Sequence, residues 1–211
     1  MADFLTMAAF VSLYVLFLFW YGGRSKALTS AETEAFLSEM RRHAGKEDKP
    51  GVEEPLLLRQ FRDLAASDDG RDFWMVNLLK FREKALYPES MAMAMGDDPL
   101  AANARYNKAI IPSLLKHGNH PVFATRVTGR FIRDTTPKDW NQVAAVRYRS
   151  RRDMLRMAVD LAGKGIDVHK WAALERTEVF PVQPYLSLFF ARFLAALVLA
   201  AVCAAMLFLL P

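Results

Sequence analysis

Three side chains in the middle of the chain have the chemistry for proton transfer or for binding an iron cofactor. His169 follows the segment Gly-Lys-Gly-Ile-Asp and precedes a strand-like stretch, so it could act as a general base or a haem ligand. Tyr106 and Tyr148 could each present a phenol to a pocket while the ring packs in the core. We take all three as candidate catalytic residues, against the alternatives of a surface-loop histidine and two tyrosines that only pack.

Three polar residues in strand-like segments are candidates for ligand binding. Alternation along a strand over 73–81 places Asn77 in a row of apolar side chains, where its amide needs either a ligand or a backbone partner. Arg126 and Arg147 also share strand faces with apolar residues, and their guanidinium groups could hold a carboxylate or a phosphate. The alternative for both arginines is a cross-strand pair with a glutamate of the last strand.

Several reaction and partner classes are excluded by what the sequence lacks. There is no Ser-His-Asp order, P-loop, Gly-x-Gly-x-x-Gly fingerprint or His-Glu-x-x-His motif. The single cysteine, Cys203, lies in an apolar run, and His117 and His120 have no carboxylates at ligand spacing, so we expect no metal site. The 28 Lys and Arg form no basic stripe, which argues against a nucleic-acid partner. The identity of any cofactor stays open.

The elements that must position these residues follow from periodicity and turn residues. A capping-box pattern at Thr29 to Glu32 predicts a helix to about His43, and a second short helix is expected over 55–66. From Asp72 onward the predicted order is β-α-β-β-α-β, the arrangement of a ferredoxin-like α+β domain. The expected segments are a strand at 73–81, a helix at 99–117, strands at 121–131 and 140–149, a helix after Ser150 that ends at 163–165, and a strand at 172–182.

Two uncharged apolar runs bracket these elements. Residues 4–21 and residues 193–210 would each cover about 27 Å as a helix, which is close to the hydrocarbon thickness of a bilayer. We therefore expect two membrane-spanning helices, with the lipid bilayer as a partner. A cleaved signal peptide is the alternative interpretation of the first run, although that run has no basic segment before it.

Basic residues predict how the two spans would be oriented. Arg24 and Lys26 follow the first run and Arg192 precedes the second, so the positive-inside rule places the middle region in the cytoplasm and both termini outside. The expected location is an inner membrane of the bacterial type. The predicted division is a transmembrane helix at 1–23, a helical connector at 24–71, the α+β domain at 72–184 and a second transmembrane helix at 185–211.

Three stretches of the predicted domain resemble a known family. They are "VNLLKFRE", "RYNKAIIPSLLKHG" and "DWNQVAAVRYRSRRDMLRMAVD", and together they are similar to the domain-of-unknown-function family 1330 of the dimeric α/β-barrel superfamily over residues 72–182. The resemblance implies a homodimer whose sheets form a barrel, with a pocket between sheet and helices or at the dimer centre. Relatives in the superfamily include antibiotic-type monooxygenases, haem-degrading and haem-using enzymes and small stress-response proteins.

Two functions are compatible with these observations. The first is a membrane-anchored α/β-barrel module that binds a small apolar or amphipathic ligand near the inner leaflet, with monooxygenase-like chemistry as one form of it. The second is a non-catalytic accessory or scaffold subunit, whose alanine-rich segment 195–205 would pack against another membrane protein. The sequence leaves open whether the protein is an enzyme.

Overall fold

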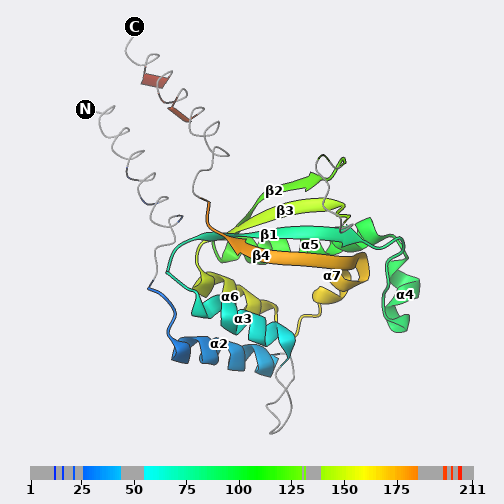
Figure 1. The fold of residues 1–211 in the computed structure, drawn as a ribbon, viewed down its shortest axis with the longest axis horizontal. Coiled ribbons are helices and arrows are strands. Elements are labelled where there is room, and N and C mark those ends of the chain that lie inside the picture. Colours follow the sequence, from blue (N-terminus) through cyan, green and yellow to red (C-terminus); the bar gives the residue numbers. More distant parts are fainter. Residues whose placement is uncertain are drawn as a thin grey trace.

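The computed structural model describes residues 26–43, 55–129, 131 and 139–184, together with the isolated residues 12, 16, 21, 197, 198, 201, 204 and 205. Its described part is an α+β domain (Figure 1). The strands are β1 (Phe73–Phe81), β2 (His120–Arg126), β3 (Gln142–Tyr148) and β4 (Leu174–Val182). The helices are α2 (Ser30–His43), α3 (Leu56–Ala66), α4 (Glu89–Met95), α5 (Pro99–Lys116), α6 (Arg151–Leu161) and α7 (Asp167–Ala173).

The four strands form one sheet in the spatial order β2-β3-β1-β4, and all neighbouring strands are antiparallel. From β1 onward the chain runs strand, helix, strand, strand, helix, strand. In addition, the short helix α4 precedes α5 along the chain and the short helix α7 follows α6. The predicted α+β class is therefore confirmed.

The three later strands are all shorter than predicted, and β3 covers Gln142–Tyr148 rather than 140–149. The last strand begins at Leu174, because residues 167–173 form the helix α7 that the sequence analysis did not expect. The strand β2 ends at Arg126, which is the last residue paired with β3, opposite Gln142.

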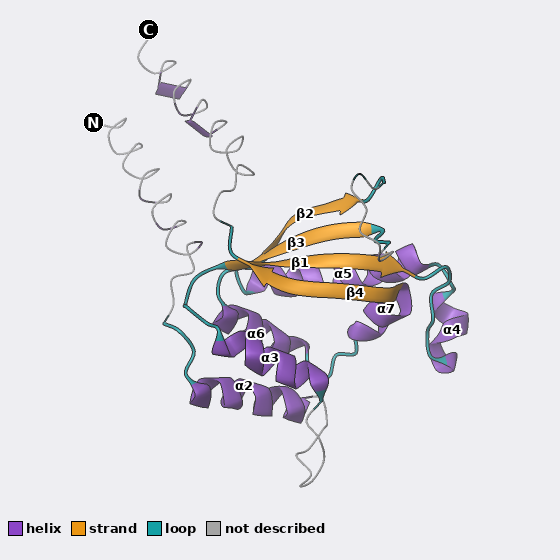
Figure 2. Cartoon of the chain, viewed as in Figure 1, coloured by secondary structure: helices purple, strands orange, loops and turns teal. Residues whose placement is uncertain are grey.

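Helices α5, α6 and α7 lie on one face of the sheet, as Figure 2 shows. At one end of β1, the fully buried Phe73 belongs to an apolar cluster with Leu114 of α5. Toward the other end, Leu79 packs in a second cluster with Ala102 of α5 and with residues of α7. Asn77 lies in β1 between these two clusters, on the same helix-covered face.

The two helices that precede the sheet pack on α6. The predicted capping box is present: the Thr29 backbone N–H donates to Glu32 Oε2 at 2.9 Å, and the Glu32 N–H donates to Thr29 Oγ1 at 3.2 Å. Glu32 also pairs with Arg152 of α6 at 2.7 Å. Leu37 of α2 and Leu155 of α6 belong to one buried cluster. The predicted connector thus contributes its own apolar contacts to the domain.

The structure does not support the predicted location in a membrane. Among the residues that the structure describes, no helix is long and apolar enough to cross a bilayer. This finding overturns the assignment as a two-span integral membrane protein with a cytoplasmic middle region and outer termini. The runs on which that assignment was based, 4–21 and 193–210, lie almost wholly outside the described residues.

Candidate functional site

The short helix α7 positions the candidate site. The chain reaches it through Gly163 and Gly165, whose φ angles of 77° and 66° are accessible to glycine without steric cost. His169, expected in a loop, lies within this helix. Because successive helical side chains point about 100° apart, His169 and Lys170 leave α7 in different directions and meet different neighbours.

His169 meets Tyr87, a buried residue of the loop before α4. The phenol oxygen of Tyr87 lies 2.9 Å from Nδ1 of His169, and the two rings meet edge to face at 5.7 Å. Arg105 of α5 donates to the same phenol oxygen at 3.4 Å. Arginine only donates, so the phenol oxygen accepts from Arg105, whereas the direction of its hydrogen bond with His169 depends on the imidazole tautomer. The three side chains form a hydrogen-bonded group that links α5, α7 and the loop before α4.

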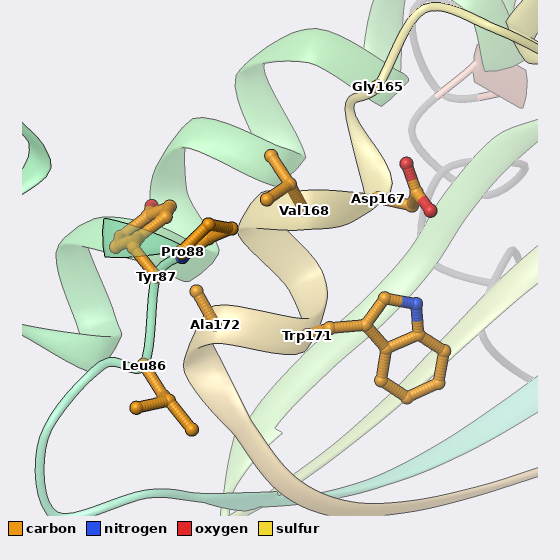
Figure 3. Close-up of a pocket in the computed structure, with 8 residues that line it drawn as sticks. All are labelled: Leu86, Tyr87, Pro88, Gly165, Asp167, Val168, Trp171 and Ala172. Carbon is orange, nitrogen blue, oxygen red and sulfur yellow. The ribbon is translucent and has the colours of Figure 1, made fainter. Parts of the chain in front are cut away.

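An open hollow of about 520 Å³ lies between α7 and the loop that carries Tyr87. Figure 3 shows Tyr87 and Pro88 on one side of α7, with Asp167 and Trp171 on the other. The lining is mainly apolar, and Asp167 is its one charged side chain. The residues that line the hollow are Leu86, Tyr87, Pro88, Gly165, Asp167, Val168, Trp171 and Ala172.

Lys170 meets aromatic rings rather than a carboxylate. Its amine lies 5.9 Å from the ring centre of Tyr106 and 5.3 Å from that of Trp171. Within the described part of the chain, no carboxylate forms an ion pair with this amine, and no group forms a hydrogen bond with it. Burial lowers the pKa of Lys170 from its ordinary value. The result is a half-buried lysine whose amine has no partner of opposite charge among the described residues.

Of the two candidate tyrosines, Tyr106 lies in α5 and is half-buried, and Tyr148 is the buried last residue of β3. Burial, with a smaller contribution from the Asp167 carboxylate, raises the pKa of Tyr106 to about 12. Burial also raises the pKa of Tyr148, and Tyr106 adds to this effect. Neither hydroxyl has a hydrogen-bond partner among the described residues. Both phenols are therefore neutral near pH 7 and can serve a ligand as hydrogen-bond donors.

The structure shows one partner for Asn77, which was predicted to bind a ligand or a backbone group. Its Nδ2 donates to the carbonyl oxygen of Met75 at 3.0 Å. The cross-strand neighbours of Asn77 are Ala144 of β3 and Val179 of β4, two small or apolar residues. The backbone alternative accounts for one amide hydrogen, and a role in ligand binding stays a prediction.

The two candidate arginines do not form a joint site. Arg126 is exposed and pairs with Gln142 at one end of β3, whereas Arg147 pairs with Trp74 at the other end. Arg147 is only 2% exposed. Its Nε binds Asp72 Oδ2 at 2.9 Å and its Nη2 donates to the Tyr21 carbonyl at 2.6 Å. The acidic partner of Arg147 is therefore Asp72, and not a glutamate of β4.

Sequence reasoning did not single out Tyr87, Arg105 or Lys170. Tyr87 and Lys170 lie in segments that read as loops, and Arg105 begins the helical stretch 105–118, which was used for the family resemblance and not for the site. One signal was present for Lys170: the glycines at 163 and 165 followed by Asp167 fit a turn that leads into a helix start. Its neighbour Tyr106 was noted on its own, and only the packing of α5 against α7 joins the two residues.

The chain has the architecture of α+β proteins with a four-stranded antiparallel sheet covered by helices, and solved structures share it. A crystal structure of RPA0582, a protein of unknown function from Rhodopseudomonas palustris, matches with a TM-score of 0.53 at 22% identity over 64% of this chain and 97% of that chain. A crystal structure of methylated RPA0582 matches with a TM-score of 0.52 at 23% identity over 65% and 98% of the two chains. At this identity the similarity shows the fold alone.

Sequence comparisons add no family assignment. No family model matches the sequence, and no curated protein matches it. The resemblance to family 1330 over residues 72–182 therefore stays a prediction.

Proposed function

We propose that this domain binds a small amphipathic molecule through a carboxylate or carbonyl oxygen at Lys170. The observation that carries the proposal is the half-buried Lys170, whose amine lies against two aromatic rings and has no ion-pair partner among the described residues. Burying an amine is unfavourable unless a polar group compensates for the lost water. A ligand oxygen at this position would supply that compensation.

The surroundings of the amine suit the rest of such a ligand. Trp171 is 54% exposed and also lines the hollow of about 520 Å³, a volume within the usual range of small-molecule sites. Its indole, with Val168 and Ala172, offers an apolar surface to a hydrocarbon chain or ring. The Tyr106 hydroxyl is a neutral donor for a second ligand oxygen.

We also propose that the domain is ferredoxin-like and forms a homodimer of the dimeric α/β-barrel type. The strand order β2-β3-β1-β4 is the one expected for a ferredoxin-like domain, and this supports the resemblance to the dimeric α/β-barrel superfamily. Trp74, Val76 and Leu78 of β1 point to the face opposite the helices and belong to none of the three core clusters of described residues. Cross-strand Phe180 is 41% exposed beside Val76. A second copy would cover this apolar face.

Calorimetric titration of the full chain with decanoate tests the ligand proposal. We expect Lys170→Met to weaken decanoate binding by about tenfold or more, since a lost charge-assisted contact changes affinity on that scale. Lys164→Met is the matched control, because Lys164 is an exposed lysine in the turn before α7. Equal affinities for the native protein and Lys170→Met, or no decanoate binding at all, would overturn the proposal. A stable complex with another polypeptide and no small ligand would favour the accessory-subunit alternative.

A further inference from the structure

The surroundings of Lys170 differ from those of Lys84, Lys116 and Lys164. Lys84 pairs with Asp97 at 3.4 Å, and Lys116 pairs with Asp160 at 2.5 Å. Lys164 is exposed to water. Lys170 has none of these stabilising partners and lies against the rings of Tyr106 and Trp171. Its ring neighbour Trp171 also lines the apolar hollow.

We infer that Lys170 is a nucleophile that forms an imine with a small amphipathic aldehyde. The inference names the ligand class of the proposed site and rests on the proposed function. It is carried by the position of the amine beside two aromatic rings, by the partial burial of the lysine, and by the absence of a carboxylate partner among the described residues.

The chemistry needs a neutral amine and no further reagent. Lysines become nucleophilic when they are desolvated in an apolar environment, and burial lowers the pKa of Lys170 in this way. The nitrogen lone pair attacks the carbonyl carbon and forms a carbinolamine. The carbon–oxygen bond then breaks, and the oxygen leaves as water with the two hydrogens that the nitrogen loses. The product is a carbon–nitrogen double bond, and no oxidation or reduction occurs.

The apolar contacts favour an aldehyde with a hydrocarbon tail. Trp171 lies beside the amine and also lines the hollow, so a tail that rests on its indole would hold the carbonyl carbon near the nitrogen. A short polar aldehyde would lack this contact. We therefore expect decanal to react at Lys170 faster than acetaldehyde does, relative to their rates at exposed lysines.

Reductive trapping tests the inference on the unmodified full chain. The protein is incubated with decanal and cyanoborohydride, which reduces an imine to a stable secondary amine, and peptide mapping by mass spectrometry locates the decyl group. We expect labelling at Lys170 to exceed labelling at Lys84 and Lys164 by about tenfold or more at pH 7.5, because exposed lysines are almost fully protonated there. Excess decanoate should protect Lys170 and leave Lys164 unaffected.

The outcomes separate the inference from the proposed function. Decanoate binding that depends on Lys170, without preferential decanal labelling of Lys170, would refute the nucleophile and leave the binding site standing. If decanoate binding does not depend on Lys170 and decanal does not label it preferentially, both the binding site and the nucleophile are refuted. Lys170→Arg is the matched variant: it keeps the charge, forms no trapped adduct at that position, and should leave labelling of Lys164 unchanged.

Discussion

The phenol oxygen of Tyr87 lies 2.9 Å from Nδ1 of His169 and thereby joins the loop before α4 to α7. Two backbone hydrogen bonds follow the same path, from Leu86 N–H to the Ala172 carbonyl at 2.9 Å and from Arg82 N–H to the Ala173 carbonyl at 3.0 Å. The loop is thus held along α7 over several residues. This attachment forms one wall of the hollow and keeps α7 in place beside α5.

Replacing Tyr87 with phenylalanine tests this attachment. Tyr87→Phe keeps the ring but leaves His169 Nδ1 without its partner, so we expect the free energy of unfolding to fall by about 1–2 kcal/mol. Urea denaturation followed by circular dichroism measures the change. Tyr106→Phe is the control, because the Tyr106 hydroxyl has no hydrogen-bond partner among the described residues and its loss should change stability little. Equal losses in the two variants would contradict the role of the Tyr87 hydroxyl.

Stability should depend on pH through Lys170. Because burial lowers the folded-state pKa of Lys170, the unfolded chain binds the proton more tightly, and this group's contribution to stability rises with pH between the folded and unfolded pKa values. Lys170→Met removes the penalty of burying the charge, so it should be more stable than the native protein near neutral pH. The difference should shrink as the pH approaches 10.5, the ordinary lysine value. Thermal unfolding of both proteins from pH 6 to about 10 checks this, and a constant difference would exclude the effect.

The buried guanidinium of Arg147 should depend on Asp72. Asp72→Asn removes the negative partner at 2.9 Å while Arg147 stays buried, and we expect a loss of about 1–3 kcal/mol in the free energy of unfolding. Asp97→Asn serves as the control, because its pair with Lys84 is largely exposed on both sides. Exposed pairs contribute less than about 1 kcal/mol. A control variant as unstable as Asp72→Asn, in the same denaturant titration, would count against the special position of Arg147.

The start of α6 should depend on Ser150. The Asp153 backbone N–H donates to Ser150 Oγ at 3.1 Å, and the serine hydroxyl donates to Asp153 Oδ2 at 2.8 Å. Ser150→Ala removes both bonds at a fully buried N-cap, so we expect a loss of about 1–2 kcal/mol. Ser67→Ala, which removes a bond from an exposed serine to the Leu64 carbonyl, should change stability by less than about 0.5 kcal/mol. Chemical denaturation compares the two variants. An unchanged free energy of unfolding in Ser150→Ala would contradict the role of Ser150 as the N-cap of α6.

The stability contributed by Asp153 should be lost in acid. Burial acts to raise its pKa, but hydrogen bonds from Arg149 and Ser150 and the nearby charges of Arg149 and Arg156 bring the pKa below its ordinary value. A folded-state pKa below the unfolded one adds stability above the unfolded value, and this addition is lost as the pH falls through the folded pKa. Asp153→Asn should therefore show a weaker loss of stability below pH 4 than the native protein. Stability is measured by denaturation at a series of acidic pH values. An equal loss of stability in Asp153→Asn and the native protein would contradict this role of Asp153.

Much of the fold could be read from the sequence because its signals are local. The strand at 73–81 was predicted with the observed bounds, and the capping box at Thr29 and Glu32 forms the predicted hydrogen bonds. Ser150 caps α6 as expected. Each of these features depends on alternation or on contacts within about four residues, so the sequence alone carries the information.

The candidate site, in contrast, was decided by tertiary structure. Tyr87 and His169 are 82 positions apart, and nothing near either residue indicates the other. Lys170 reads as one more surface lysine until α7 packs on α5 and places the amine against Tyr106. Alternation identified apolar faces for Arg126 and Arg147, but only the strand register shows that they lie at opposite ends of β3. Burial and the identity of a partner depend on segments far apart in the chain, and such contacts leave no periodic trace in the sequence.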